Sequence, residues 1–486
     1  MEDSRIGKIT NTTMKGENKT ELQQTLNTLD VLVVAFGAMI GWGWVVSSGQ
    51  WITTGGALGT AIAFVIGGIM IYLVGLTYAE LTTAMPKNGG AQNFSFAAFG
   101  PIGSFVCTWA LILSYVGVVC FEAVSFPTII QYIFPQFLKG YLYTVMGFDI
   151  YISWLIVAIL TAALIVFINI KGTKVAAKFQ TILTAIIAGV GIILVVASAF
   201  SGSTENISNQ MFVGETSSTM VSNVLKVAIM TPFFLFGFDV IPQAAEEIKI
   251  PLKRLGKMMI LSIVMAVSFY ALVVLAVSYA MSKEEITTAM GGSGLVTATA
   301  MEIAFNSTTM AKVLIIGGLC GIVTSWNSFL IGGSRILFSM AKSHMIPRTF
   351  SRLHHRYRTP IVSLLLLGSI SIISLFFGKV MLVWIVDAAN FACCLAYCIV
   401  SMSFLILRYK KPDMPRPYKV SYGKFVGVLA VIMSGIMAMM YIIPGTNCSL
   451  LWQEWIIVGS WILLGTLLAI RSKRLYKDKF ASGMDM

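Results

Sequence analysis

Residues 31–54, VLVVAFGAMIGWGWVVSSGQWITT, form an apolar segment that is long enough to cross a bilayer, which takes about 20 helical residues. Four glycines interrupt it, and each weakens a helix by about 1 kcal/mol relative to alanine: Gly37, Gly41, Gly43 and Gly49. A broken helix survives in lipid only where the freed backbone groups are buried in protein or line a cavity. Secondary transporters use such breaks to bring backbone dipoles to the substrate. The segment therefore favours a transporter, and close helix packing through small residues is the alternative.

The composition predicts an all-α polytopic membrane protein. Of the 486 residues, 57% are hydrophobic and 11% are charged, whereas soluble domains carry about 25% charged residues. Residues 1–28 are polar and contain no apolar signal-peptide core. Twelve apolar spans are predicted: 29–53, 58–84, 102–133, 153–170, 176–200, 221–248, 257–282, 311–341, 361–378, 380–407, 423–444 and 452–471.

The net charge of +13 is explained by membrane orientation. If the N-terminus is cytoplasmic, the inside segments hold 28 of the 34 Lys and Arg residues: 1–28, 85–101, 171–178, 249–257, 342–360, 408–424 and 471–486. This positive-inside bias predicts that both termini are cytoplasmic. The basic residues are then expected to contact membrane lipid headgroups, and no nucleic-acid partner is expected.

The chain gives no sign of a metal, a cofactor or catalysis. Six of its seven cysteines lie within predicted spans, where they behave as small hydrophobes. All three histidines lie in one basic loop, outside the spans. No glycine-rich phosphate loop and no nucleophile–base constellation is found. We therefore expect neither ATP-driven pumping nor an enzyme.

A second interrupted helix occurs five spans after the first. The sixth span contains Pro232, Gly237 and Pro242, with the acidic Asp239 at mid-depth. Two interrupted helices in corresponding positions indicate an inverted-topology repeat with the substrate site between its halves. The predicted organisation is a tail at 1–28, repeats at 29–200 and 221–407, helices eleven and twelve at 423–471, and a tail at 472–486.

The chain resembles the amino acid–polyamine–organocation (APC) permeases over nearly its whole length. Five blocks in order carry the resemblance: GAMIGWG (Gly37–Gly43), TYAELTTAMPKNGGAQNFSFAAFGPIGSFVCTW (Thr77–Trp109), FFLFGFDVIPQAAEEIKIP (Phe233–Pro251), GGSRILFSMAKSHMIPRTFSRLHHRYRTP (Gly332–Pro360) and RYKKPDMPRPYKV (Arg408–Val420). The resemblance implies a five-plus-five inverted-repeat (LeuT-like) fold with helices one and six unwound. It also implies secondary active transport of amino acids or related amines across the plasma membrane by alternating access.

The resemblance implies a carboxylate site at the break in helix one. In relatives, backbone N–H groups of this unwound segment bind the substrate carboxylate, and free helix N-termini suit anions physically. The matching positions here are Ile40, Gly41, Trp42 and Gly43.

In helix six, the resemblance implies that Phe233 covers the substrate, that Gly237 presents open backbone carbonyls and that Asp239 helps gate the site. In helix three, residues 115–122 are expected to face the site. In helix eight, Phe329 matches an aromatic contact position.

Two residues depart from the family pattern. Trp42 stands where relatives carry a small residue, and an indole there would fill part of the carboxylate pocket, as in ethanolamine-type permeases. This favours, as an alternative substrate, a small amine such as an ethanolamine-like or quaternary ammonium compound. Proton-coupled relatives carry a lysine midway along helix five, where this chain has Ile187 or an immediate neighbour, and no Lys follows Lys178 in this span. The open alternatives are exchange, Na⁺ coupling and H⁺ coupling through a different site.

Three predicted intramembrane carboxylates, Glu122, Asp239 and Asp387, are candidates for selecting a cationic amine. Aromatic residues near them would add cation–π attraction of about 0.5–2 kcal/mol each: Trp42, Tyr115, Phe236 and Phe238. The alternative is that each carboxylate pairs with Arg335, faces water or is protonated. Arg335 itself is interpreted as structural. A non-transporting nutrient sensor with the same fold is the remaining functional alternative.

Overall fold

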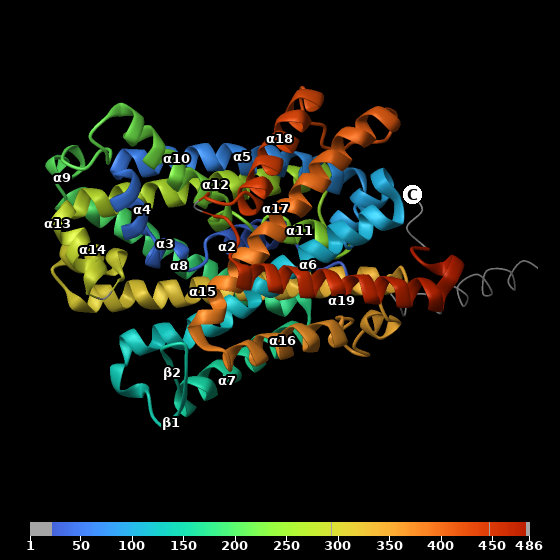
Figure 1. Ribbon diagram of the computed structural model, residues 1–486, viewed down its shortest axis with the longest axis horizontal. Coiled ribbons are helices and arrows are strands. Elements are labelled where there is room, and N and C mark those ends of the chain that lie inside the picture. Colours follow the sequence, from blue (N-terminus) through green and yellow to red (C-terminus); the bar gives the residue numbers. More distant parts are fainter. Residues whose placement is uncertain (1–21, 293, 447, 483–486) are drawn as a thin grey trace, which may run out of the picture.

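The computed structural model describes residues 22–292, 294–446 and 448–482, so most of the predicted N-terminal tail and the last four residues lie outside the described part. The described chain is predominantly helical, and its helices run mostly along the long axis of the molecule (Figure 1). Ten of the described segments are long and apolar enough to cross a membrane: Thr28–Val46, Ala57–Ala84, Ala91–Ile133, Ile152–Ile170, Thr173–Ser201, Leu252–Ala280, Thr308–Lys342, Trp384–Lys410, Gly423–Ile442 and Trp452–Lys479. The protein is therefore a multi-pass membrane protein.

The secondary structure follows the predicted spans closely. The elements are α2 (Thr28–Met39), α3 (Gly43–Val46), α4 (Ser48–Gly55), α5 (Ala57–Ala84), α6 (Ala91–Ile133), η1 (Pro135–Phe137), β1 (Tyr141–Val145), β2 (Phe148–Tyr151), α7 (Ile152–Ile170), α8 (Thr173–Ser201), α9 (Thr204–Ser208), α10 (Ser217–Phe234), α11 (Val240–Gln243), η2 (Ala245–Glu247), α12 (Leu252–Ala280), α13 (Lys283–Gly291), α14 (Val296–Phe305), α15 (Thr308–Lys342), η3 (Arg348–Ser351), α16 (Ile361–Leu375), α17 (Gly378–Lys410), α18 (Gly423–Ile442), α19 (Trp452–Tyr476) and η4 (Lys477–Lys479).

Two of the twelve predicted spans are shorter in the structure than expected. The predicted span 221–248 is divided between α10 and the short helices α11 and η2. The predicted span 361–378 contains α16, which has 15 residues and is about 22 Å long at 1.5 Å per residue. This is less than the roughly 30 Å hydrocarbon core of a bilayer. The structure thus gives ten full-length candidates where the sequence predicted twelve.

Two local departures correct the sequence prediction. The chain is not wholly helical, because β1 and β2 form an antiparallel hairpin around Met146 and Gly147, which both have positive φ. A helical segment, 91–99, precedes the predicted third helix, and the non-helical Gly100 (φ 75°) separates the two parts of α6. Residues 91–99, predicted to be part of a connecting segment, are therefore helical.

The first span begins with a well-formed helix cap. The Asn27 side chain accepts hydrogen bonds from the backbone N–H groups of Leu29 and Asp30 at 2.8 and 3.1 Å. The Asp30 carboxylate in turn accepts one from the Asn27 N–H at 2.9 Å. This reciprocal capping box satisfies donors that a helix start would otherwise leave free.

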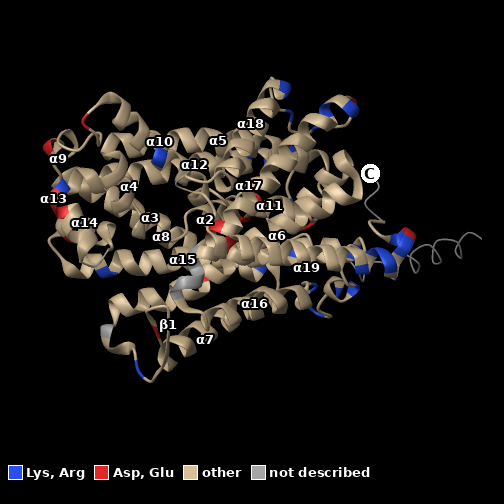
Figure 2. Ribbon diagram, in the orientation of Figure 1, with Lys and Arg blue, Asp and Glu red and all other residues tan. Residues whose placement is uncertain are grey.

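The charged residues are distributed unequally between the two ends of the molecule. Figure 2 shows most Lys and Arg residues at one end, together with the described C-terminus. We call this the basic end, and it includes the connecting segments 342–360 and 408–424. Helix α6 runs through the middle of the bundle, contacting α15, α16 and α17. By contrast, α19 lies at the periphery, and only 17% of its most apolar 18-residue stretch is buried.

Candidate functional site

The breaks in the first and sixth predicted spans lie against each other. Helix α2 ends at Met39 and α3 begins at Gly43, while α10 ends at Phe234 and α11 begins at Val240. Gly237 has φ +128°, and a Cβ atom on it would lie only 2.7 Å from the Cβ of Ala38. Glycine is therefore needed here both for its backbone conformation and for its small size.

A cavity of about 270 Å³, which we call the central cavity, lies beside these breaks. Seven of the twelve predicted site residues line it: Gly41, Trp42, Gly43, Glu122, Phe233, Phe236 and Phe329. Its other lining residues come from α2, α3, α6, α10, α12, α15 and α17 and their ends: Ala38, Met39, Val46, Ser47, Gly117, Val118, Phe121, Phe234, Tyr270, Ser325, Val386, Ala389 and Asn390.

Backbone donors face the cavity at the first break. Within the described chain, the N–H groups of Gly41, Trp42 and Gly43 have no backbone partner, whereas the flanking Ile40 N–H donates to the Phe36 carbonyl at 3.0 Å. The freed Met39 carbonyl accepts a hydrogen bond from the Tyr270 hydroxyl at 3.0 Å. The carbonyl groups of Ile40 and Gly41 have no hydrogen-bond partner among the described residues either, so the break leaves both donors and acceptors free. The free donors suit an anionic ligand group.

One carboxylate of the central cavity has no cation beside it. Glu122 is 3% exposed, and it takes part in no ion pair among the described residues. Ser325 also lines the cavity, and the Oε2 atom of Glu122 has no hydrogen-bond partner among the described residues. A buried charge without a partner is costly. A ligand cation in the cavity would remove that cost.

Aromatic side chains form much of the cavity wall. The Phe233 ring meets those of Phe234 and Phe236 edge-on, at centroid distances of 4.8 and 6.4 Å. The Trp42 indole lies so close to Gly318 of α15 that a Cβ atom there would be only 2.0 Å away. Trp42 thus lines the cavity while part of its indole packs against α15.

The other five predicted site residues do not line the central cavity: Ile40, Tyr115, Gly237, Phe238 and Asp239. Asp239 is fully buried and accepts hydrogen bonds from the hydroxyls of Tyr115 at 2.7 Å and Tyr397 at 2.8 Å. The Gly237 N–H also donates to it, at 3.2 Å. Asp239 thus connects α6 and α17 to the second break, and both of its carboxylate oxygens accept hydrogen bonds.

A buried ion pair lies further toward the basic end. The Arg335 side chain donates from Nε to Glu247 Oε1 at 2.7 Å and from Nη2 to Thr173 Oγ1 at 2.7 Å. Both charged side chains are almost inaccessible to solvent. The predicted structural role of Arg335 fits this geometry. The pair joins α15 to the segment after α11 and to the start of α8.

Residues from separate sequence blocks close the basic end. Glu80 of α5 pairs with Arg408 and Arg416, and Asn88 exchanges two 3.0 Å hydrogen bonds with Glu246. The backbone also bridges Leu26 and Ile248. These contacts join segments that are far apart in the sequence.

Sequence reasoning did not single out Tyr270, Ser325 or Asn390, although all three contribute polar groups to the cavity lining. Asn390, in the middle of an apolar span, was the clearest available signal. The third predicted carboxylate, Asp387, interacts with Glu454 of α19 and is not part of the cavity lining. Ile187 is buried between α8 and α15, beside the Gly41 carbonyl group.

Comparison with known proteins identifies the family. The sequence profile described as amino acid permease matches residues 26–467. The chain is similar to the methylthioribose transporter of Bacillus subtilis, with 24% identity covering 94% of this chain and 95% of the relative. It is also similar to two other B. subtilis proteins, the branched-chain amino acid permease BcaP (25% identity; 85% and 86% covered) and the aspartate–proton symporter (23%; 91% and 81%).

Proposed function

Because this chain belongs to the amino acid permease family and is a secondary transporter, we propose that its central cavity binds an amino acid or a related amine. The observation that carries the proposal is the pairing of opposite polar groups at the cavity. Free N–H groups at Gly41–Gly43 suit a carboxylate, and Glu122 suits an ammonium group. A Cβ atom on Gly41 would lie 3.4 Å from Glu122 Oε1, so one small zwitterion can reach both.

We infer twelve spans in a five-plus-five repeat, with α10–η2 as the sixth and α16 as the ninth. The division of the first and sixth spans at the cavity is the unwinding that this fold would require. The basic end then faces the cytoplasm of a plasma membrane, in keeping with the positive-inside rule. In alternating access, Asp239 and the Arg335–Glu247 pair would hold the cytoplasmic side closed while the cavity opens outward.

The amine-selective alternative rests on Trp42, which lines the central cavity where relatives carry a small residue. The relatives named above are transporters, which favours transport over the sensor alternative. Coupling through a helix-five lysine is unsupported in this chain, because the apolar Ile187 lies at that place beside the Gly41 carbonyl. Coupling to H⁺ or Na⁺ at another site stays a prediction, as does exchange.

Two assays test the proposal. A thermal-shift screen of purified protein across amino acids and amines should find a stabilising ligand, because a ligand stabilises by RT ln(1+[L]/Kd). The same ligand should then be taken up by proteoliposomes, with imposed H⁺ and Na⁺ gradients and internal ligand varied separately. Binding without any flux would contradict transport and support the sensor.

The Gly41→Val substitution should abolish ligand binding without unfolding the protein. The atoms nearest to a Cβ atom on Gly41 belong to Glu122 and Ser325, at 3.4 Å or more. Both residues line the central cavity, so we expect the larger side chain to be tolerated and to take up ligand space. Position 43 differs, because a Cβ atom there would lie 2.3 Å from the Phe234 ring. Gly43→Val should therefore also lower the unfolding temperature. Unchanged transport kinetics in both variants would make these glycines packing residues.

Replacing Trp42 with serine should change which substrates are carried. The smaller side chain would open space next to the free N–H groups. We therefore expect the Trp42→Ser variant to transport α-amino acids that the wild type transports poorly. Competition against uptake of one labelled substrate, across a panel of amino acids and amines, would measure this. A uniform loss for every compound would instead identify Trp42 as a packing residue.

A further inference from the structure

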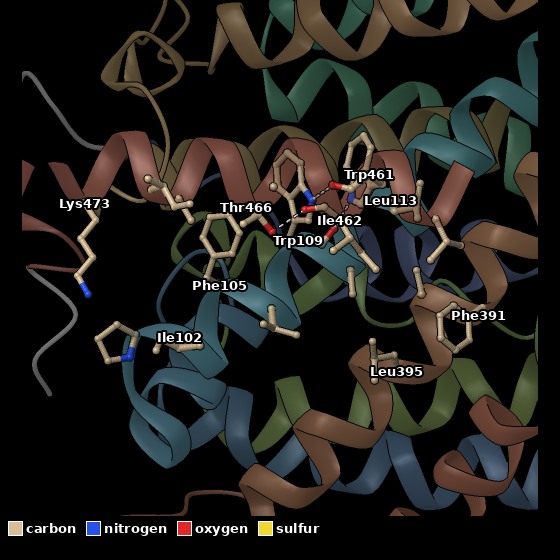
Figure 3. A pocket seen from close by; sticks show the side chains of 18 of the residues that line it. Ile102, Phe105, Trp109, Leu113, Phe391, Leu395, Trp461, Ile462, Thr466 and Lys473 are labelled. Carbon is tan, nitrogen blue, oxygen red and sulfur yellow. Dashed lines mark hydrogen bonds between the residues drawn. The ribbon is translucent and has the colours of Figure 1, made fainter. Parts of the chain in front are cut away.

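A second hollow lies on the outside of the bundle, between α6, α17 and the peripheral α19. It has a volume of about 650 Å³, and Figure 3 shows the side chains that line it. We call it the membrane groove. Its lining is apolar or aromatic except for Thr466 and Lys473. The Thr466 hydroxyl already donates to the Ile462 carbonyl at 2.8 Å.

A pair of tryptophans gives the membrane groove a fixed floor. The rings of Trp109 and Trp461 stack at a centroid distance of 4.6 Å. Each indole N–H donates to the other residue's carbonyl, at 2.9 and 3.0 Å. Gly465 permits this approach, since a Cβ atom there would lie 2.3 Å from Trp109 Nε1. Both indole donors are thus occupied, and an apolar surface faces the groove.

The membrane groove has the length and polarity of a lipid. Its α19 side extends from Val458 to Lys473, which is about 22 Å at 1.5 Å per residue. Half of a bilayer's hydrocarbon core is about 15 Å thick. Figure 3 shows the Lys473 side chain at one end, beyond Phe105 and Ile102. Lys473 is exposed and lies shortly before the described C-terminus, which is at the basic end of the molecule, where a headgroup would meet it.

We propose that the membrane groove binds one anionic glycerophospholipid, with an acyl chain along the tryptophan floor and its phosphate at the Lys473 ammonium. The groove contributes the apolar surface that an acyl chain contacts, and Lys473 supplies the opposite charge. Lys473 is the one cation among the described residues that line the groove. This favours a lipid over a second copy of this chain, whose own α19 would bring another lysine to the same place. The inference is independent of the transported substrate.

Lipid binding to the purified full-length protein tests this proposal. Native mass spectrometry in neutral detergent would compare phosphatidylglycerol with phosphatidylcholine of the same acyl chains. Lys473→Gln should weaken phosphatidylglycerol binding about fivefold and leave phosphatidylcholine unchanged, since one lysine near an anionic lipid contributes about 1 kcal/mol. Arg474→Gln is the matched control: it removes one cation from the same helix, outside the groove lining, and should have little effect. Ala469→Phe fills the groove and should displace both lipids.

The outcomes distinguish a specific lipid-binding site from general electrostatic attraction of anionic lipid to the surface. Equal losses in Lys473→Gln and Arg474→Gln would overturn the proposal, because they would indicate only surface charge. Retention of both lipids in Ala469→Phe would also overturn it. A second protein copy bound in wild type and lost in Ala469→Phe, with lipid binding unaffected, would show that the groove is a dimer interface and contradict the lipid site. The thermal stability of each variant without added lipid controls for misfolding.

Discussion

Replacing Arg335 with methionine should lower the free energy of unfolding by about 3–5 kcal/mol, the usual effect of removing one partner from a buried ion pair. The change leaves Glu247 with a charge and without the 2.7 Å contact from the Arg335 Nε atom. It also removes the donor that reaches Thr173. Thermal or chemical unfolding of the detergent-purified variant against wild type would measure the loss.

Two companion variants make this stability prediction specific. Arg471→Met removes an exposed arginine from α19 and should change the unfolding free energy by less than about 0.5 kcal/mol. Adding Glu247→Gln to Arg335→Met should restore part of the loss, because the second change removes the unpaired charge. If Arg335→Met is as stable as wild type, the pair does not hold the basic end together.

Replacing Glu122 with glutamine should raise the Km for a cationic substrate about 10–100-fold. Glutamine keeps the size of the side chain but removes the charge. A charge-assisted hydrogen bond contributes about 1.5–3 kcal/mol, and each 1.4 kcal/mol corresponds to a factor of ten. Proteoliposome uptake across a range of substrate concentrations would measure the change.

The matched control for this kinetic prediction is Asp387→Asn. It also neutralises one carboxylate within the membrane, but Asp387 lies beside Glu454 and outside the cavity lining. If the substrate cation is attracted by direct contact with Glu122, the Km of the Asp387→Asn variant should stay within about threefold of the wild-type Km. Equal effects of the two variants would instead indicate a general electrostatic effect on the substrate.

The sequence predicted the parts of the fold that depend on local signals. Gly41 and Gly43 mark the first break, and Gly237 marks the second, because glycine and proline weaken helices wherever they occur. Apolar length and the positions of Lys and Arg predicted most of the membrane spans and the basic end. The prediction missed the helical segment 91–99, which it assigned to a connecting segment and which Gly100 separates from the rest of α6.

The roles of the carboxylates could not be predicted in the same way. Glu122 and Asp239 are both acidic residues in apolar helices, and the sequence gives them equal claims to a substrate cation. Their difference lies in distant partners: Tyr397, 158 positions along the chain from Asp239, donates to it. Glu122 keeps an oxygen without a partner at the cavity. Only the tertiary structure brings these groups together. It therefore distinguishes Asp239, which connects helices, from Glu122, which is a candidate for binding substrate.

The central claim is that Glu122 binds the substrate's ammonium group, and equilibrium binding of two matched ligands tests it most directly. The ligands are the amino acid with the largest thermal shift and its analogue without the amino group, each titrated calorimetrically into wild type and Glu122→Gln. We predict that wild type prefers the amine-bearing ligand by about 10–100-fold and that this preference disappears in the variant. The same preference in both proteins would contradict the claim and place the ammonium elsewhere.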